Sequence, residues 1–193
     1  MATNNTITNK EKETGTLEKI SWKLDPDHSE VAFQVKHMMI SNVRGYLKDF
    51  SVEVTSDDEN FSNAEIFFSG KMDSISTSNE KRDQHLRSEE FFDIENNPEI
   101  TFRSAQYTQT EEGKYKLEGD LTIKGTTQKV ILDVDFGGIQ TDPWGNEKAG
   151  FSVTGKINRK DFGLNWNTAL EKGGMLVGDD VKISCEIQLI KDK

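Results

Sequence analysis

The sequence has one cysteine and no long apolar run. A single cysteine, Cys185, excludes a disulfide within the chain. It lies on the apolar face of an alternating segment, Val181 to Leu189, which predicts a small, buried hydrophobic side chain and argues against a catalytic thiol. No segment approaches the roughly 18 consecutive apolar residues that a membrane-spanning helix needs, so we expect no stable membrane insertion.

The first residues also lack the apolar stretch of a secretory signal. Residues 1–16 are polar throughout, which predicts a disordered N-terminal tail ahead of a single domain spanning residues 17–193. With no signal of this kind, we expect the protein to stay in the cytoplasm.

The patterns of the common catalytic and metal sites are missing too. No glycine-rich phosphate loop, nucleophile elbow or zinc-ligand spacing occurs. The histidines, His28, His37 and His85, form no metal-binding spacing, and Asp83 and His85 stand two apart on a predicted helix, so they point in different directions. We expect no catalytic residues, no metal and no cofactor, although a hydrolase or isomerase of an unrecognised type stays open.

The chain has fewer positively than negatively charged residues. Lys and Arg number 24 against 34 Asp and Glu, for a net charge of −10. Sequence-independent binding of nucleic acid needs clustered cations that neutralise phosphates, so we expect no nucleic-acid partner. The same balance argues against docking on an anionic membrane through a basic patch, and it favours solubility.

Apolar residues recur at every second position along most of the chain, which is typical of strands with one buried face. About eight such segments follow one another through mostly short turns, and no long Greek-key connection separates them. The apolar phase changes between Leu47 and Phe50, which predicts a bulge at Gly45 or at Lys48–Asp49. The pattern predicts an all-β fold, an eight-stranded antiparallel barrel, in preference to a sandwich.

One segment, Ser76 to Phe92, interrupts the alternation. Thr77 and Glu80 have the spacing of a capping box, and no Gly, Pro or β-branched residue occurs from there to Arg87, which predicts a helix of two to three turns. Leu86 is the only large apolar residue of this helix, so the helix cannot form part of the core.

We expect the helix to lie across one end of the barrel, held by Leu86 and by Phe91 and Phe92. It would then place polar side chains near an opening. The alternative is a solvated connection that meets no ligand.

Phenylalanine is abundant, with 11 residues against 3 Tyr and 3 Trp. Many of these side chains fall on the inward phase, which is compatible with either a packed core or an elongated apolar cavity. A barrel of about eight strands is just wide enough to be filled by side chains or to hold one small ligand. Gly119 and Gly155 fall on the same phase and would leave gaps, but periodicity alone does not decide between the two interiors.

Several short segments, taken in their order along the chain, resemble the lipocalin-like YceI family of polyisoprenoid-binding proteins. Together they extend from about Trp22 to the C-terminal strand. The segments are Trp22-x-Leu24-Asp25-x-x-His28-Ser29, Val31 to His37, Val43-Arg44-Gly45, Arg82-Asp83-x-His85-Leu86-Arg87-Ser88 with Phe91-Phe92, Pro98-x-Ile100-x-Phe102-x-Ser104, Gly119-x-Leu121-Thr122-Ile123-Lys124-Gly125, Arg159-Lys160-Asp161-Phe162-Gly163 and Val177-Gly178-Asp179.

The resemblance implies a lipocalin-like barrel that binds, stores or transports a long-chain isoprenoid or a similar fatty amphiphile without a reaction. Arg82, Asp83 and His85 would then be candidates for the head-group end, because a buried polar head needs hydrogen-bonding partners. The residues expected to line the lumen are Phe33, Val35, Phe68, Leu86, Phe91, Phe102, Leu121, Phe151 and Ile157.

Three matters stay open at this point. An enzyme acting on such a lipid and a stress-response module with a filled interior are the alternatives to a carrier. Family members are often exported, in contrast to the cytoplasmic location expected above. A homodimer is compatible with the sequence.

Overall fold

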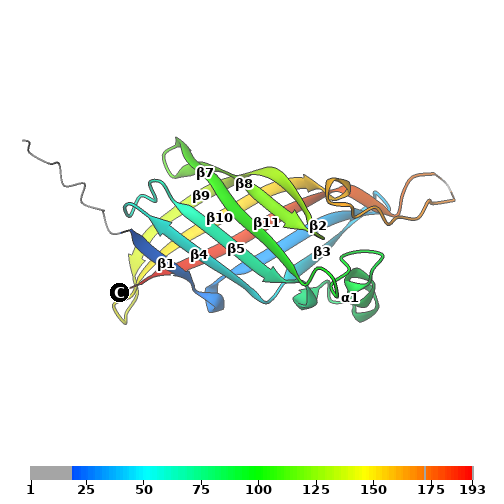
Figure 1. Cartoon of the computed structure of the whole chain (residues 1–193), viewed down its shortest axis with the longest axis horizontal. Coiled ribbons are helices and arrows are strands. Elements are labelled where there is room, and N and C mark those ends of the chain that lie inside the picture. Colours follow the sequence, from blue (N-terminus) through cyan, green and yellow to red (C-terminus); the bar gives the residue numbers. More distant parts are fainter. Residues whose placement is uncertain (1–18, 172, 193) are drawn as a thin grey trace, which may run out of the picture.

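The computed structural model describes residues 19–171 and 173–192, so the predicted tail at residues 1–16 lies outside the described residues. The described chain forms a closed antiparallel barrel of eight strands with one α-helix, α1 (Glu80–Arg87), at one end (Figure 1). The predicted all-β, lipocalin-like barrel with a short helix at its end is confirmed.

The ring of eight strands is assembled from eleven strand segments. β11 (Val177–Lys191) pairs with both β1 (Ile20–Leu24) and β2 (Glu30–His37), so these two form one broken strand. Each of the next two strands around the ring is likewise made of two segments. The ring closes where β1 pairs with β11. The remaining segments are β3 (Ser41–Leu47), β4 (Phe50–Ser56), β5 (Glu65–Lys71), β6 (Ile75–Ser76), β7 (Glu99–Glu111), β8 (Lys114–Ile123), β9 (Thr126–Thr141) and β10 (Glu147–Asn158).

The change of apolar phase falls where β3 gives way to β4. The backbone amides of Lys48 and Asp49 both donate to Ser74 Oγ, at 3.1 and 3.0 Å. The break therefore lies at Lys48–Asp49, one of the two expected positions, and Gly45 lies inside β3.

Asn79, and not Thr77, is the N-cap of α1. The Asn79 side chain accepts a hydrogen bond from the backbone amide of Arg82 at 3.0 Å. The predicted capping box was wrong because the helix begins at Glu80, which leaves Thr77 too far from its first turn. No helix within the described residues is long and apolar enough to cross a membrane.

Gly119 and Gly155 do not leave gaps in the wall. The ring of Phe102 lies where a side chain at Gly119 would stand, and Leu132 occupies the corresponding space at Gly155. Each glycine admits a large side chain from the neighbouring strand. The expectation that these glycines widen the interior was therefore wrong.

A buried polar cluster joins the broken first strand to the last two strands. Asp25, which is 5 % exposed, accepts hydrogen bonds from Lys148 at 2.7 Å and Gln188 at 2.8 Å, and it lies 3.0 Å from His28 Nδ1. Burial by itself would raise the pKa of Asp25, but the bonds to Lys148, Gln188 and His28 outweigh it and lower the pKa from 3.8 to about 2. The ionised carboxylate thus stabilises the seam between β1, β10 and β11.

Replacing Gly119 by Ala should destabilise the barrel. The added Cβ would clash with the Phe102 ring and with the backbone carbonyl of Arg103, so we expect Gly119→Ala to lower the free energy of unfolding by about 1–3 kcal/mol in urea titrations. Gly150→Ala is the matched control, because open space surrounds Gly150. An equal loss in the two variants would contradict this account of the wall.

The Asp25 cluster predicts a specific acid sensitivity. Because the folded-state pKa of Asp25 is lowered, its contribution to stability is complete above pH 3.8 and is lost as the pH falls toward about 2. We expect unfolding free energy to fall less steeply over this range in Asp25→Asn than in the wild type. In Lys148→Gln, which lacks the closest partner, the folded-state pKa of Asp25 lies nearer 3.8, so the loss of unfolding free energy over this range should be smaller than in the wild type.

Candidate ligand-binding cavity

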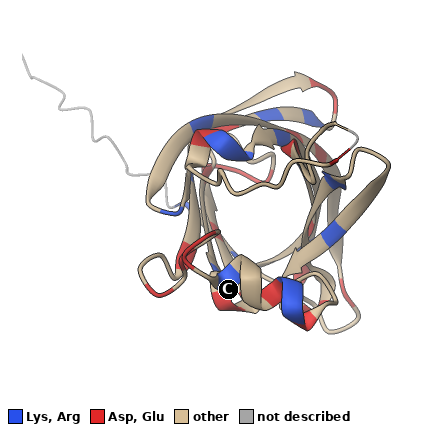
Figure 2. Cartoon of the chain, turned by 90° about the vertical axis from the view of Figure 1, so that its right-hand side faces the viewer, with Lys and Arg blue, Asp and Glu red and all other residues tan. Residues whose placement is uncertain are grey.

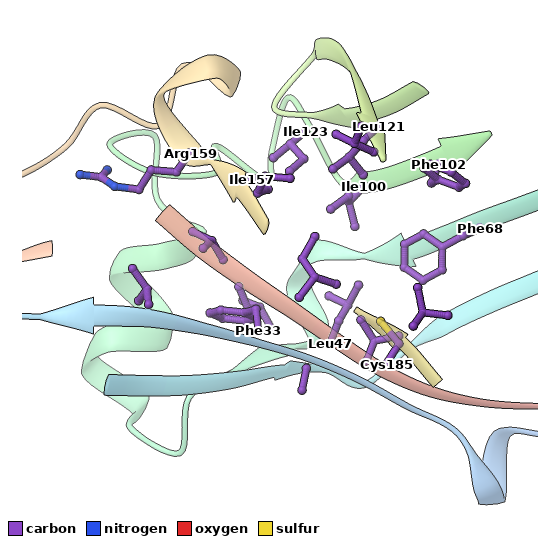
Figure 3. A pocket seen from close by; sticks show the side chains of 18 of the residues that line it. Phe33, Leu47, Phe68, Ile100, Phe102, Leu121, Ile123, Ile157, Arg159 and Cys185 are labelled. Atoms are coloured by element: carbon purple, nitrogen blue, oxygen red, sulfur yellow. The ribbon is translucent and has the colours of Figure 1, made fainter. Parts of the chain in front are cut away.

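The interior of the barrel holds an apolar cavity of about 620 Å³. Side chains from several strands surround it, among them Phe33, Phe68, Phe102 and Leu121 (Figure 3). This volume lies within the range of about 300–1,000 Å³ that is usual for small-molecule sites. The barrel therefore does not have a filled interior.

All nine side chains expected in the lumen line this cavity. Seven come from β2, β5, β7, β8 and β10, where they agree with the inward phase of the period-two pattern, and two come from α1 and the segment after it. Their contact with a ligand stays a prediction. The nine are Phe33, Val35, Phe68, Leu86, Phe91, Phe102, Leu121, Phe151 and Ile157.

An aromatic cluster packs the end of the cavity near β1, away from α1 (Figure 1). Phe61, from the loop between β4 and β5, is 3 % exposed, and its ring centroid lies 5.1 Å from that of Trp22, 5.4 Å from Phe136 and 4.9 Å from Phe151. Phe61 was not expected at this site because it stands in an acidic turn outside any alternation.

At the opposite end of the barrel, α1 lies at the rim (Figure 2), and the charged residues that line the cavity come from elements at this end. Lys36 comes from β2, Lys81 and Arg82 from α1, and Arg159 from the 3-10 helix η3 (Arg159–Phe162) that follows β10. No Asp or Glu is among the described residues that line the cavity. The charged lining of the cavity is therefore cationic in a chain whose net charge is −10.

Arg82 lies at this mouth and is held by Thr77. Its Nε donates to Thr77 Oγ1 at 2.7 Å and its Nη2 donates to the Thr77 carbonyl at 2.9 Å. Asp83 does not line the cavity: it is 4 % exposed and accepts from the amide of Thr77 at 2.8 Å and from its hydroxyl at 2.5 Å. Asp83 thus holds Thr77 in place, and Thr77 in turn holds Arg82. Direct contact of Asp83 with a head group stays a prediction, and this geometry does not support it.

His85 lines the cavity but is already engaged. Its Nε2 lies 2.6 Å from Glu90 Oε2, and its ring stands edge-on to Phe91 and Trp166, with centroids 5.1 and 4.7 Å apart. The ring therefore supports the aromatic rim of the mouth, and a role in holding a head group stays a prediction.

Arg159, like Lys36 and Lys81, is a charged lining residue that was not singled out from the sequence. It is 3 % exposed, its Nε donates to the carbonyl of Gly178 at 2.9 Å, and its Nη1 donates to the carbonyls of Trp166, at 2.9 Å, and Leu164. Arg159 appeared only within a family motif, since a buried cation at the end of a strand has no signature in an apolar pattern.

Two weaker polar groups face the cavity elsewhere. Burial raises the pKa of Cys185 to about 12, so its thiol stays protonated at neutral pH. Burial also raises the pKa of Tyr107, whose hydroxyl has no hydrogen-bond partner within the described part of the chain. Residues 19–171 and 173–192 contain no group of three or more His, Cys, Asp or Glu that could hold a metal ion.

Removing the Asp83 carboxylate should destabilise the mouth. Asp83→Ala leaves two buried Thr77 donors without an acceptor, so we expect the free energy of unfolding to fall by about 2–4 kcal/mol. Denaturant titration measures this, with Glu80→Ala on the exposed side of α1 as the control. A loss no greater than that of the control would show that Asp83 is not structural.

Comparisons with known proteins agree with this architecture. The model of the YceI-like domain family matches residues 22–189. A UPF0312 protein of Staphylococcus aureus strain N315 is 40 % identical over 169 residues, which cover 87 % of this chain and 96 % of the relative.

Solved structures show the same barrel. The YceI protein of Campylobacter jejuni superposes with a TM-score of 0.71 at 29 % identity, covering 98 % of this chain and 100 % of that one. BcnA of Burkholderia cenocepacia gives a TM-score of 0.73 at 24 % identity, covering 86 % and 98 %. A polyisoprenoid binding domain from Saccharophagus degradans gives 0.66 at 11 % identity, covering 90 % and 100 %, and at this identity it bears on the fold alone. With its family model, its relatives and its barrel in agreement, this chain belongs to the YceI-like domain family.

Proposed function

We propose that the protein binds a long-chain isoprenoid or a similar amphiphilic lipid in its barrel and carries or stores it without chemical change. The observation that carries this proposal is the combination of an apolar cavity of about 620 Å³ with a polar mouth at one end. A structural neighbour from Saccharophagus degradans is described as a polyisoprenoid binding domain, which agrees with a ligand of this kind.

The size of the cavity suits one lipid tail. If each carbon of a tail takes about the 30 Å³ that a water molecule takes in the liquid, roughly twenty carbons fill a space of this volume. Such a tail would break few hydrogen bonds along the wall, because the wall is almost wholly hydrocarbon. Its polar end would lie among the charged side chains at α1.

The chemistry of the wall favours binding over catalysis. A nucleophile or general base that works at neutral pH needs a pKa near 7. The pKa of the Cys185 thiol is raised to about 12. The His85 imidazole is paired with Glu90 on the rim, and Asp83 is turned to Thr77. A carrier needs only the shape and polarity of this space.

The first experiment is native mass spectrometry of protein purified without detergent, followed by solvent extraction. We expect a bound amphiphile of about one copy per chain, or uptake of added geranylgeraniol by the empty protein. Protein that carries nothing and takes up no C20 isoprenoid would overturn the proposal.

A matched pair of substitutions on β10 tests the location of the ligand. Val153 lines the cavity, and Thr154 beside it is exposed, so Val153→Trp fills the lumen and Thr154→Trp adds the same ring outside. We expect the affinity for geranylgeraniol to fall at least about tenfold in Val153→Trp and to stay unchanged in Thr154→Trp, because a filled cavity excludes the tail. Equal affinities in the two variants would place the ligand elsewhere.

A further inference from the structure

The charged side chains that line the cavity are of a single sign. Four cationic residues, Lys36, Lys81, Arg82 and Arg159, are among the lining residues, and none of the described lining residues is a carboxylate. Acidic residues outnumber basic ones by 34 to 24 in the whole chain, so the charged lining has the opposite sign from the chain as a whole. A neutral head group would not need a cationic lining.

Arg82 brings a charge that no carboxylate neutralises. No Asp or Glu among the described residues lies within ion-pair distance of its guanidinium, and Asp83 is turned to Thr77. Thr77 accepts from Nε and Nη2, and within the described chain Nη1 makes no hydrogen bond. The guanidinium is therefore fixed in position with donor capacity to spare.

Arg159 supplies an independent observation. Its side chain is 97 % buried, and its Nη2 has no hydrogen-bond partner in the described part of the chain. Asp179 Oδ1 lies 3.7 Å from this Nη2, which is within ion-pair distance but too far for a hydrogen bond, and Asp179 also pairs with Lys160 at 2.9 Å. Buried donors of charged groups are rarely left without an acceptor, because desolvation without a partner is unfavourable.

The two arginines belong to the same end of the cavity. Trp166 connects them: its carbonyl accepts from Arg159 Nη1 at 2.9 Å, and its ring packs edge-on against His85 of α1, the helix that carries Arg82. Figure 3 shows Arg159 beyond Ile157, with its guanidinium directed away from the apolar side chains of the lumen. A ligand whose tail fills the lumen would thus end between α1 and η3.

We propose that the lipid bound here carries an acidic head group, a carboxylate or a phosphate, held at the mouth by Arg82 and Arg159. This inference rests on the proposed function and narrows its ligand class. Both acids present oxygens that accept paired N–H donors from a guanidinium, whereas an alcohol or a quinone offers no charge.

The test compares three probes that share one tail: geranylgeraniol, geranylgeranic acid and geranylgeranyl phosphate. We expect one or both acids to bind the wild-type protein about tenfold more tightly than the alcohol, since hydrogen bonds to a charged group are stronger than those to a neutral one. The acid that binds more tightly identifies the head group as carboxylate or phosphate.

Arg82→Gln should abolish this preference. We expect its affinity for the acids to fall to the level of the alcohol, with affinity for the alcohol unchanged, and Arg82→Lys to keep part of the preference. Arg44→Gln on the exposed face of β3 is the matched control, because it removes the same charge away from the cavity. Arg159→Lys, which retains a cation for the folded loop, should weaken binding of the acids and spare the alcohol.

The outcomes separate this inference from the proposed function. If the alcohol binds as tightly as both acids, or if Arg82→Gln weakens all three probes alike, the acidic head group is wrong while the lipid-binding function stands. If none of the three probes binds, the proposed function fails and this inference fails with it. Thermal unfolding of each variant confirms that the binding measured is that of folded protein.

Discussion

The pairing of β11 with both halves of the first strand is the constraint on which the cavity depends. β11 joins β10 on one side and, on the other, β2 and then β1, so one strand closes the ring despite the break at Asp25–Ser29. A closed ring has no free edge, and its strand number fixes its width. Because the interior is bounded by hydrogen-bonded backbone, it cannot contract onto its side chains when no ligand is bound. The Asp25 cluster lies at this closure, where a loss of pairing would open the wall.

The interior stays partly empty for a related reason. Side chains pack well along the wall, as Phe102 does over Gly119 and Phe33 over Gly45, and this lateral packing directs bulk along the sheet and away from the axis. Packing the end near β1 with Phe61 completes the enclosure there. Lateral packing stabilises the barrel and leaves its axis open. The side chains that stabilise the barrel therefore do not occupy the space in which a ligand would bind.

The sequence was informative where one rule governs many residues. Period-two alternation identified the strands and agrees with the seven expected lumen side chains that lie on them, since the inward phase of a barrel strand has one meaning everywhere. It failed where a single contact decides. Thr77 has the residue type and spacing of a helix cap, and only the path of the chain shows that Asn79 takes this place. Whether Gly119 leaves a gap depends on the ring of a residue in another strand, and whether Asp83 faces a ligand depends on Thr77, which no local pattern records.

The opposed charges of the whole chain and of the cavity lining have a physical consequence for how a ligand would be chosen. The net charge of −10 disfavours the approach of an anion at long range, but salt screens exposed charges beyond about 8 Å at physiological ionic strength. Arg159 is buried and Arg82 half-buried, so a head group that they held at hydrogen-bond distance would be only weakly screened. Long-range repulsion and short-range attraction together would slow association more than they weaken the final complex. Selectivity for the head group would then reside in the rate of release, because only a seated ligand reaches the two guanidinium groups.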